Sequence, residues 1–341
     1  MAKQNQLRLG VATLVETAMP ELTKLARTVE ECGYSHFWVP DERLLRNVYV
    51  CLATIANATS QIGLSTGVTN PYTRHPAHTA AAIATIDELS GGRASLALGA
   101  GGGLETYGLE HTQPVHALRE AVEIVQQLTA GETVTMTGKR YALRDAHLDF
   151  QPLRPVPVYL ASRGPRILQL AGEVADGVVI GGFAQAGGIS YAQEHVQKGL
   201  TKAGRPASAV DQMSWLYVSA APDRLAAREA VSKIVLASLI TSRPILDQIG
   251  VDLPPNLRAH LDASGWRYPK ETPKQAAELL PDHMLDAFAV YGTPEECVAK
   301  LQAIRACGID HMTFVLFPAA GQTLTSLTKL LAAEVLPALQ A

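Results

Sequence analysis

The sequence of 341 residues predicts an α/β fold, a TIM (β/α)8 barrel with insertions. Eight short apolar segments alternate with longer segments of helical periodicity, and parallel strands need such crossover helices between them. Most of the strand candidates end in glycines or polar residues, as barrel strands do where a site is built. Eight strands also close a sheet without an edge. The alternative is an open doubly wound sheet.

The strand candidates are short runs of apolar and β-branched residues, as expected for buried parallel strands. They lie at 7–13, 35–40, 62–69, 93–99, 156–161, 176–181, 212–219 and 310–316. The helix candidates repeat apolar residues with a helical period. They lie at 19–32, 49–59, 76–89, 114–129, 164–173, 188–203, 222–238, 292–306 and 323–335.

Two segments interrupt this alternation. Residues 132–150 alternate with period two around the pair Gly138-Lys139, which predicts an inserted β-hairpin. Residues 241–291 are dense in proline, with short helical pieces between the prolines. Segments inserted after barrel strands commonly form lids or subunit contacts, so we expect a lid-like segment there. No linker is visible, and we expect residues 1–341 to form a single domain.

The composition allows a large core and narrows the class of partner. Hydrophobic residues make up 47% of the chain, and 29 basic residues against 32 acidic ones give a formal net charge of -3. This balance offers no basic surface to nucleic acid or to an anionic membrane, so we expect a small-molecule substrate. The cysteines and histidines lack metal-ligand spacing, and the amino terminus has no apolar signal core. We therefore expect a soluble, cytoplasmic protein without a metal site.

The segment 67–76 ends an apolar strand in a loop that is crowded with hydrogen-bonding side chains. Residues just after each strand form the site of a barrel, so this loop is a candidate. After the second strand, the apolar run gives way to Asp41, Glu42 and Arg43, which suit proton transfer or the binding of polar substrate atoms. The alternative is a solvated loop in which Asp41 pairs with Arg43 or Arg46.

Glycines and a serine mark the ends of later strands. The run 99–103 is almost without side chains and lets the backbone approach a planar ring or a phosphate. Residues 161–166 place a hydroxyl, a guanidinium and backbone N–H groups at a helix start, which suits a phosphate monoester. Capping by Ser162 explains the same residues. The pair Gly181-Gly182 fits close approach to a ligand or a tight turn.

The strand ends together resemble the bacterial-luciferase-like family of flavin and deazaflavin enzymes, and most closely its 5,10-methylenetetrahydromethanopterin reductase branch. The resemblance covers nearly the whole chain. Each motif alone is weak, whereas the order and spacing of the set are specific. The motifs are Trp38-Val39-Pro40-Asp41-Glu42, Arg46-Asn47-Val48-Tyr49, the segment 67–76, Asp87-Glu88-Leu89-Ser90-Gly91-Gly92-Arg93, Ala161-Ser162-Arg163-Gly164-Pro165 and Ala171-Gly172-Glu173-Val174-Ala175-Asp176-Gly177.

The resemblance implies a barrel that binds the ring of FMN or of the deazaflavin coenzyme F420 at the carboxyl ends of its strands. It also implies a non-prolyl cis peptide at Gly67-Val68, which supports one face of the ring. The implied catalytic residues are Asp41, Glu42 and Asn70. The implied cofactor-binding residues are Gly67, Val68, Thr69, Gly101, Gly102, Ala161, Ser162, Arg163, Gly164, Pro165, Gly181 and Gly182. Arg74 and His75 are interpreted as loop and helix-start residues.

The leading hypothesis is a coenzyme F420-dependent oxidoreductase that transfers a hydride between the deazaflavin and a small organic substrate. A carboxylate at position 41 or 42 would handle the accompanying proton. The first alternative is an FMN-dependent luciferase-like monooxygenase, and the second is a barrel that binds a flavin without turnover. Relatives are commonly dimers or tetramers, so we expect a homodimer or homotetramer. The apolar faces of 49–59 and 76–89 are candidate subunit contacts.

Overall fold

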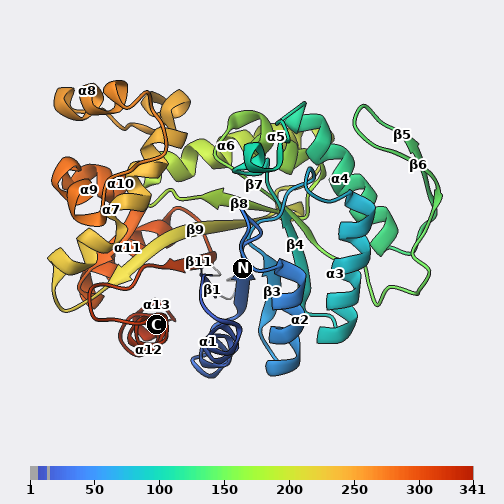
Figure 1. Ribbon diagram of the computed structural model, residues 1–341, viewed down its shortest axis with the longest axis horizontal. Coiled ribbons are helices and arrows are strands. Elements are labelled where there is room, and N and C mark those ends of the chain that lie inside the picture. Colours follow the sequence, from blue (N-terminus) through green and yellow to red (C-terminus); the bar gives the residue numbers. More distant parts are fainter. Residues whose placement is uncertain (1–6, 14–15, 341) are drawn as a thin grey trace. The chain divides into compact units, whose positions relative to one another are not determined.

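The computed structural model describes residues 7–13 and 16–340 (Figure 1). The amino-terminal residues 1–6, on which the expectation of a missing signal core rests, lie outside the described part. The strands are β1 (Arg8–Ala12), β2 (His36–Val39), β3 (Gly63–Thr66), β4 (Ala94–Leu98), β5 (Val134–Thr137), β6 (Ala142–Ala146), β7 (Val158–Ser162), β8 (Gly177–Gly181), β9 (Asp211–Ala220), β10 (Ala289–Gly292) and β11 (His311–Leu316).

The strand order shows a closed barrel. Within the described chain, the large sheet has the order β10-β9-β11-β1-β2-β3-β4-β7-β8, and β9 also pairs with β8. Eight of these strands therefore form a closed ring. The ninth strand, β10, lies outside the ring and pairs with β9. The predicted TIM (β/α)8 fold is confirmed, and the alternative of an open doubly wound sheet is not formed.

Helices follow most of the barrel strands, as predicted. The helices are α1 (Met19–Glu31), α2 (Val48–Ala58), α3 (Pro76–Ser90), α4 (Pro114–Thr129), α5 (Pro165–Val174), α6 (Ala186–Ala203), α7 (Arg224–Thr241), α8 (Pro255–Ala263), α9 (Pro273–Leu279), α10 (Asp282–Phe288), α11 (Pro294–Ala306), α12 (Leu324–Glu334) and α13 (Leu336–Gln340). Short 3-10 helices lie at Leu104–Tyr107, Ala207–Ala209, Arg243–Ile245 and Asp247–Ile249.

The chain divides into two compact units. The first contains Arg8–Val179 and His195–Met213. The second contains Ile180–Glu194, Ser214–Ala341 and Met1–Leu7, as far as these segments are described. The single domain expected for residues 1–341 stays a prediction.

In the first unit, the residues of the motif 87–93 hold the amino-terminal ends of the strands rather than a ligand. The Arg93 guanidinium donates to the carbonyls of Ala56, Thr59 and Ile62, at the end of α2 and the start of β3. The carboxylate of Asp87 is buried, and it accepts from the Ala94 N–H at 2.9 Å and pairs with Arg154 at 2.8 Å. The motif 87–93 is therefore a structural one.

The motif 171–177 is also explained by packing in the first unit. A Cβ at Gly172 would lie 2.2 Å from the carbonyl oxygen of Val196, so α5 and α6 touch backbone to backbone there. A Cβ at Gly177 would lie 2.1 Å from the ring of Tyr159. Glu173 pairs with Arg119 and with Lys202. These positions need small or charged residues for contacts within the fold.

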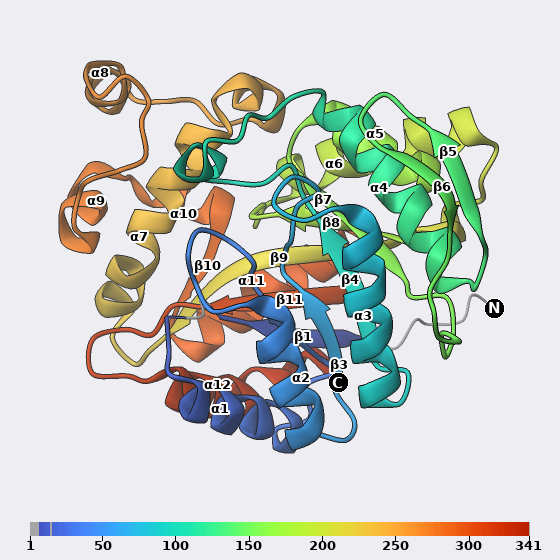
Figure 2. The same cartoon turned by 45° about the vertical axis from the view of Figure 1, so that its right-hand side comes forward.

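Residues 134–146 form an antiparallel hairpin of β5 and β6, inside the segment 132–150 for which the sequence predicts one. It lies along the outer side of α4 in two views (Figures 1 and 2). Its turn closes with a hydrogen bond of 2.8 Å from the Gly138 N–H to the Tyr141 carbonyl.

In the second unit, the segment 241–291 contains the short helices that its prolines predict, and it also contains a strand that we did not predict. Strand β10 pairs in parallel with β9, with Ala289 opposite Tyr217. The helix predicted at 292–306 accordingly begins at Pro294, where Thr293 and Glu296 form a capping box. A role of 241–291 as a lid stays a prediction.

Candidate functional site

The end of β3 carries the cis peptide predicted from the resemblance, at Gly67-Val68. Strand β3 ends at Thr66, and Thr69 makes an isolated parallel bridge to Leu98. Val68 leans against the end of β4, because a Cβ at Gly99 would lie 2.9 Å from its Cγ2 atom. The same Cβ would lie 3.7 Å from the carbonyl oxygen of Ala161. The ends of β3, β4 and β7 thus meet at Gly99.

Asp41 follows β2 and is held by two residues that come from other segments. Its Oδ2 atom accepts a hydrogen bond from the Thr69 hydroxyl at 2.6 Å. The same oxygen lies 3.5 Å from Nη1 of Arg74. These two partners differ from the arginines, Arg43 and Arg46, that the solvated-loop alternative named. Asp41 is therefore held within the site through Oδ2, whereas Oδ1 makes no hydrogen bond or ion pair that is shown for the described chain.

Glu42 stands beside Asp41 in the sequence but in a more open position. Its side chain is 42% exposed, against 22% for Asp41. Its carboxylate lies 3.3 Å from the Arg43 guanidinium, which in turn lies 3.6 Å from Glu16. Ion pairs that are this exposed contribute little to stability.

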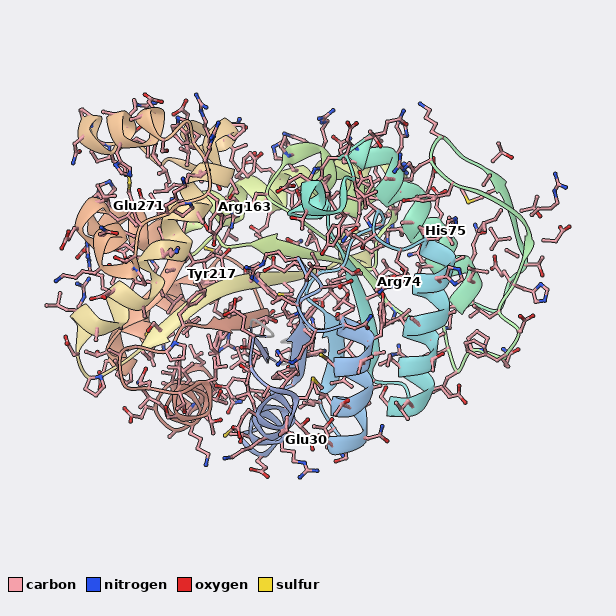
Figure 3. The ribbon with its side chains drawn as sticks, in the orientation of Figure 1. Glu30, Arg74, His75, Arg163, Tyr217 and Glu271 are labelled. Atoms are coloured by element: carbon pink, nitrogen blue, oxygen red, sulfur yellow. The ribbon has the colours of Figure 1, made fainter. Side chains whose placement is uncertain are left out.

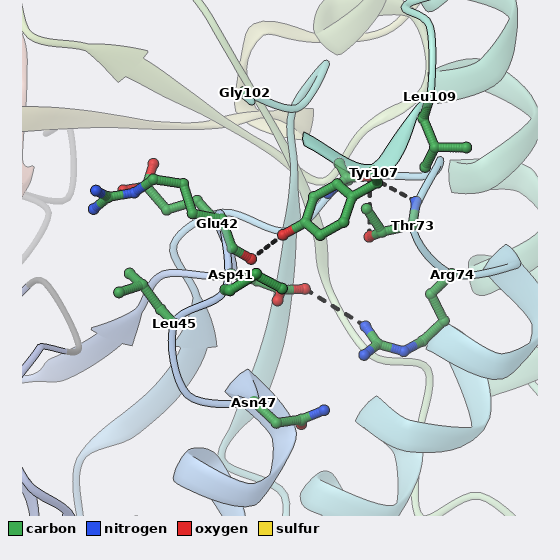
Figure 4. A pocket seen from close by; sticks show the side chains of 12 residues that line it. Asp41, Glu42, Leu45, Asn47, Thr73, Arg74, Gly102, Tyr107 and Leu109 are labelled. Carbon is green, nitrogen blue, oxygen red and sulfur yellow. Dashed lines mark hydrogen bonds and ion pairs between the residues drawn. The ribbon is translucent and has the colours of Figure 1, made fainter. Parts of the chain in front are cut away.

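A pocket of about 340 Å3 opens over these residues (Figure 4). It contains four of the residues predicted for the site, namely Asp41, Glu42, Asn70 and Gly102. Its other lining residues are Arg43, Leu44, Leu45, Asn47, Thr73, Arg74, Tyr107 and Leu109. The lining is mostly polar, so it suits a ligand with several hydrogen-bonding groups.

Asn70 fixes the loop on the inner side of the pocket. Its Oδ1 atom accepts from the N–H groups of Tyr72 at 2.9 Å and Thr73 at 3.0 Å. Asn70 is 5% exposed and lines the pocket, and the amide nitrogen of its side chain makes no hydrogen bond that is shown for the described chain. That nitrogen is a donor for a bound molecule.

Beside Asn70, the backbone of the β4 loop is open to the pocket. A Cβ at Gly101 would lie 3.2 Å from Asn70, and Gly101 has a φ of 82°, which favours glycine. A Cβ at Gly102 would meet no atom within 4 Å. The carbonyl oxygen of Gly101 accepts from His111 at 2.5 Å. A flat group can therefore approach this backbone closely.

Arg74 is a pocket residue that the sequence did not lead us to expect. Its guanidinium lies 4.7 Å above the ring of Tyr49 on one side and faces Asp41 on the other. Burial raises the pKa of Tyr49 to about 12, so this tyrosine stays neutral beneath the guanidinium. The next residue, His75, caps α3 as predicted, with Nδ1 accepting from the Ala77 N–H at 3.2 Å. Both residues lie at the start of α3 (Figure 3).

The candidate phosphate site lies at the start of α5. The Ser162 hydroxyl accepts from the N–H of Gly164 at 2.9 Å, so it shapes the turn. Gly164 is the residue before the helix and offers no side-chain cap, and Pro165 opens the helix. Ser162 does not cap this helix, so the first N–H groups of α5 have no side-chain acceptor in the described chain. Arg163 comes directly before Gly164 in the sequence.

Gly181 and Gly182 lie at the end of β8, in the second compact unit. Gly182 has a φ of 64°, and its N–H donates to the carbonyl of Trp215 at 2.8 Å. This N–H is thus used by the fold, as the tight-turn interpretation requires. A role of either glycine in binding stays a prediction.

Among the described residues, no three His, Cys, Asp or Glu side chains gather in a way that could hold a metal ion. None of the helices in that part of the chain is long and apolar enough to cross a membrane.

With the geometry established, the chain can be compared with known proteins. Residues 4–311 match the luciferase-like monooxygenase family. The chain is 34% identical over 310 residues to a 5,10-methylenetetrahydromethanopterin reductase of Archaeoglobus fulgidus, across 90% of this chain and 92% of the relative. It is 29% identical over 353 residues to an F420-dependent glucose-6-phosphate dehydrogenase of Kineococcus radiotolerans, across 98% and 97% of the two chains.

A solved structure extends this similarity to the fold. The coenzyme F420 dependent tetrahydromethanopterin reductase from Methanopyrus kandleri superposes with a TM-score of 0.85 at 26% sequence identity. The match covers 97% of this chain and 99% of the reductase.

Proposed function

The chain belongs to the luciferase-like monooxygenase family, and on that premise we propose that it is a coenzyme F420-dependent oxidoreductase acting on a small organic substrate. One observation carries the proposal: an open glycine backbone and a fixed carboxylate border the same pocket, at Gly102 and Asp41. The relatives named as F420-dependent support the choice of coenzyme.

The residues present fit a deazaflavin. The backbone at Gly102 has room on its pocket side, and Asn70 offers an amide donor beside it. The start of α5, with Ser162 and Arg163, provides N–H groups and a cation for a phosphate. When bound, coenzyme F420 supplies the ring carbon that gives or accepts the hydride, while the protein supplies position and electrostatics.

Asp41 is the residue that we assign to the proton. Thr69 and Arg74 both contact its Oδ2 atom, so the carboxylate keeps one orientation. The other oxygen, Oδ1, is then the atom that takes a proton from the substrate or returns it. Glu42 borders the same pocket, and the ion pair shown for it in the described chain is with its neighbour Arg43. We therefore assign Glu42 to substrate contact.

The first test is a binding titration. Purified full-length protein is titrated with oxidised F420, with reduced F420 and with FMN, and binding is followed by fluorescence. We expect saturable F420 binding and negligible FMN binding. Tight binding of FMN alone would favour the monooxygenase alternative and contradict the proposal.

Gly102→Leu places a side chain in the open space beside the backbone, so it should block the ring without a clash inside the fold. We expect at least a ten-fold loss of F420 affinity, which corresponds to about 1.4 kcal/mol. Ala130→Leu, at the exposed end of α4, is the matched control and should bind F420 like the native chain. Equal affinities in both variants would remove Gly102 from the site.

Turnover is tested with the compounds that the relatives' names specify. Reduced F420 with methylenetetrahydromethanopterin and oxidised F420 with glucose 6-phosphate are followed by F420 absorbance, alongside a panel of small alcohols. Binding of F420 without any turnover would favour the binding-protein alternative.

We also propose a cytoplasmic homodimer or homotetramer. Its support is the exposed apolar side chains on α2 and α3, where Val50 is 61% and Leu89 is 44% exposed. Light scattering after size-exclusion chromatography measures the number of subunits, and a monomer across the working concentration range would contradict it.

A further inference from the structure

The inserted hairpin reaches the loop that carries three of the pocket residues. We call residues 70–75, between the end of β3 and α3, the site loop. The Tyr141 hydroxyl, in the turn of the hairpin, donates to the carbonyl of Pro71 at 2.6 Å. The ring of Tyr141 also meets His75 edge-on, with 5.2 Å between ring centroids. Arg140 lies 5.3 Å above the ring of Tyr72. A segment about 70 residues away thus touches much of the site loop.

The site loop has no helix or strand of its own, so side chains determine its path. On the pocket side, Asn70 accepts from the N–H groups of Tyr72 and Thr73. On the outer side, the Tyr72 hydroxyl donates to the Thr112 carbonyl at 3.1 Å, and Tyr141 holds Pro71. The positions of Thr73 and Arg74 depend on both sets of contacts, because a functional side chain is only as fixed as the residues that support it.

The turn that carries Tyr141 is itself anchored to α4. The carboxylate of Glu120, which is 7% exposed, accepts from the N–H groups of Lys139 at 2.7 Å, Arg140 at 2.9 Å and Tyr141 at 2.9 Å. A Cβ at Gly138 would lie 2.4 Å from this carboxylate, so glycine is required there. A hairpin that served only as a surface insertion would not need a buried carboxylate to fix its turn.

We propose that the hairpin is part of the site, and that Tyr141 is a positioning residue that fixes the site loop and with it Asn70, Thr73 and Arg74. The chemistry for which these residues are positioned rests on the proposed function, whereas the contact itself does not. Burial raises the pKa of Tyr141 above its usual range, so its hydroxyl remains a donor at neutral pH.

The test is hydrogen exchange on the full chain without ligand. Tyr141→Phe removes one hydroxyl and keeps the ring against His75. We expect the amides of Tyr72 and Thr73 to exchange about five-fold faster, the factor that one net hydrogen bond contributes. Glu120→Gln, which weakens the anchor of the turn, should accelerate the same two amides.

Thr135→Val is the matched control within the hairpin. Thr135 exchanges hydrogen bonds with Asp145 at 2.9 Å and is not among the residues that contact the site loop. This variant should leave Tyr72 and Thr73 at the native exchange rate. Native exchange in Tyr141→Phe, or equal acceleration in Thr135→Val, would overturn the proposal.

A second readout separates positioning from simple stability. Tyr141→Phe should bind oxidised F420 about five-fold more weakly, while its urea midpoint stays near that of Thr135→Val. A loosened loop with native F420 affinity would also overturn the positioning role. If the native chain binds no F420 but its loop responds as expected, the proposed function fails and the hairpin contact stands.

Discussion

Asp41 and Glu42 are adjacent in the sequence, but among the described residues their contacts differ. Thr69 and Arg74 reach its Oδ2 atom from beyond β3, whereas Glu42 contacts its neighbour Arg43. Because its partners are fixed, the carboxyl group of Asp41 keeps one orientation, and proton transfer requires a group that is held in one orientation. We therefore expect the two residues to respond differently to substitution.

Asp41→Asn should lower kcat by about 10²- to 10⁴-fold, because a positioned acid or base contributes that much to a transfer. Glu42→Gln should change kcat by less than about ten-fold, because substrate contact outside the proton path affects mainly KM. Both constants are measured with whichever compound the substrate screen shows to be turned over, and F420 titration checks that each variant still binds coenzyme. A larger loss in Glu42→Gln than in Asp41→Asn would reverse the assignment.

Arg74 is a residue whose place in the pocket could not be predicted from the sequence. An arginine before His75-Pro76 resembles a helix-start residue, and its position gives no hint of Asp41, 33 residues earlier. The cis peptide at Gly67-Val68 was predictable only through the resemblance, since the strand pattern runs past it without a break. Local pattern identifies loop residues, but their partners depend on which strand ends the fold brings together.

Among the elements, the crossing of α5 and α6 depends on two glycines. A Cβ at Gly172 would lie 2.2 Å from the Val196 carbonyl oxygen, and one at Gly199 would lie 1.9 Å from that of Gln169. Backbone atoms cannot move aside as a side chain can, so the helices would have to separate. The sequence shows both glycines inside helical patterns but not that they face each other.

Gly172→Ala tests this crossing. Alanine favours an isolated helix over glycine by about 1 kcal/mol, but overpacking a rigid contact costs about 1 to 3 kcal/mol or more. We expect the cost of overpacking to exceed the gain in helix propensity, so the free energy of unfolding measured in urea should fall. Lys198→Ala, on the exposed side of α6, is the control and should stay within about 0.5 kcal/mol of the native chain. A stabilised Gly172→Ala would show that the helices separate easily.

Strand β10 shows why one element was missed. It has four residues, Ala289–Gly292, directly after α10 and a proline-dense region, so no run long enough to show a strand period exists. Its pairing with β9 supplies the hydrogen bonds that make it a strand. The ends of the barrel strands, by contrast, were predicted to within three residues, because each strand is buried and bounded by turn residues.

Over the whole molecule, several carboxyl groups are stabilised in their charged form. Burial alone would raise the pKa of Glu30, but the N–H groups of Gln61, Ser60 and Ile62 outweigh it and hold the pKa below its usual range. Likewise for Glu173, burial is outweighed by Lys202 and Arg119, and its pKa is lowered. In the second unit, hydrogen bonds from Arg228 and Arg224 lower the pKa of Asp282.

These lowered pKa values predict how stability depends on pH. A carboxyl group with a lower pKa in the folded than in the unfolded chain binds fewer protons when folded, so its stabilisation is complete above the unfolded pKa. The stabilisation is lost as the pH falls through the folded pKa. The free energy of unfolding should therefore decline below about pH 4.5, near the unfolded pKa of glutamate. Urea unfolding at several pH values between neutrality and strong acid measures this decline.

Glu30→Gln is the variant that tests the origin of the acid sensitivity. Glutamine can still accept N–H groups of residues 60–62 but does not titrate, so the decline below pH 4.5 should be shallower than in the native chain. Glu132→Gln is the control, because it removes an exposed carboxylate that follows α4, and it should keep the native slope. Identical slopes in all three proteins would show that Glu30 does not contribute to the pH dependence, and the loss of stability would then belong to the other paired carboxylates.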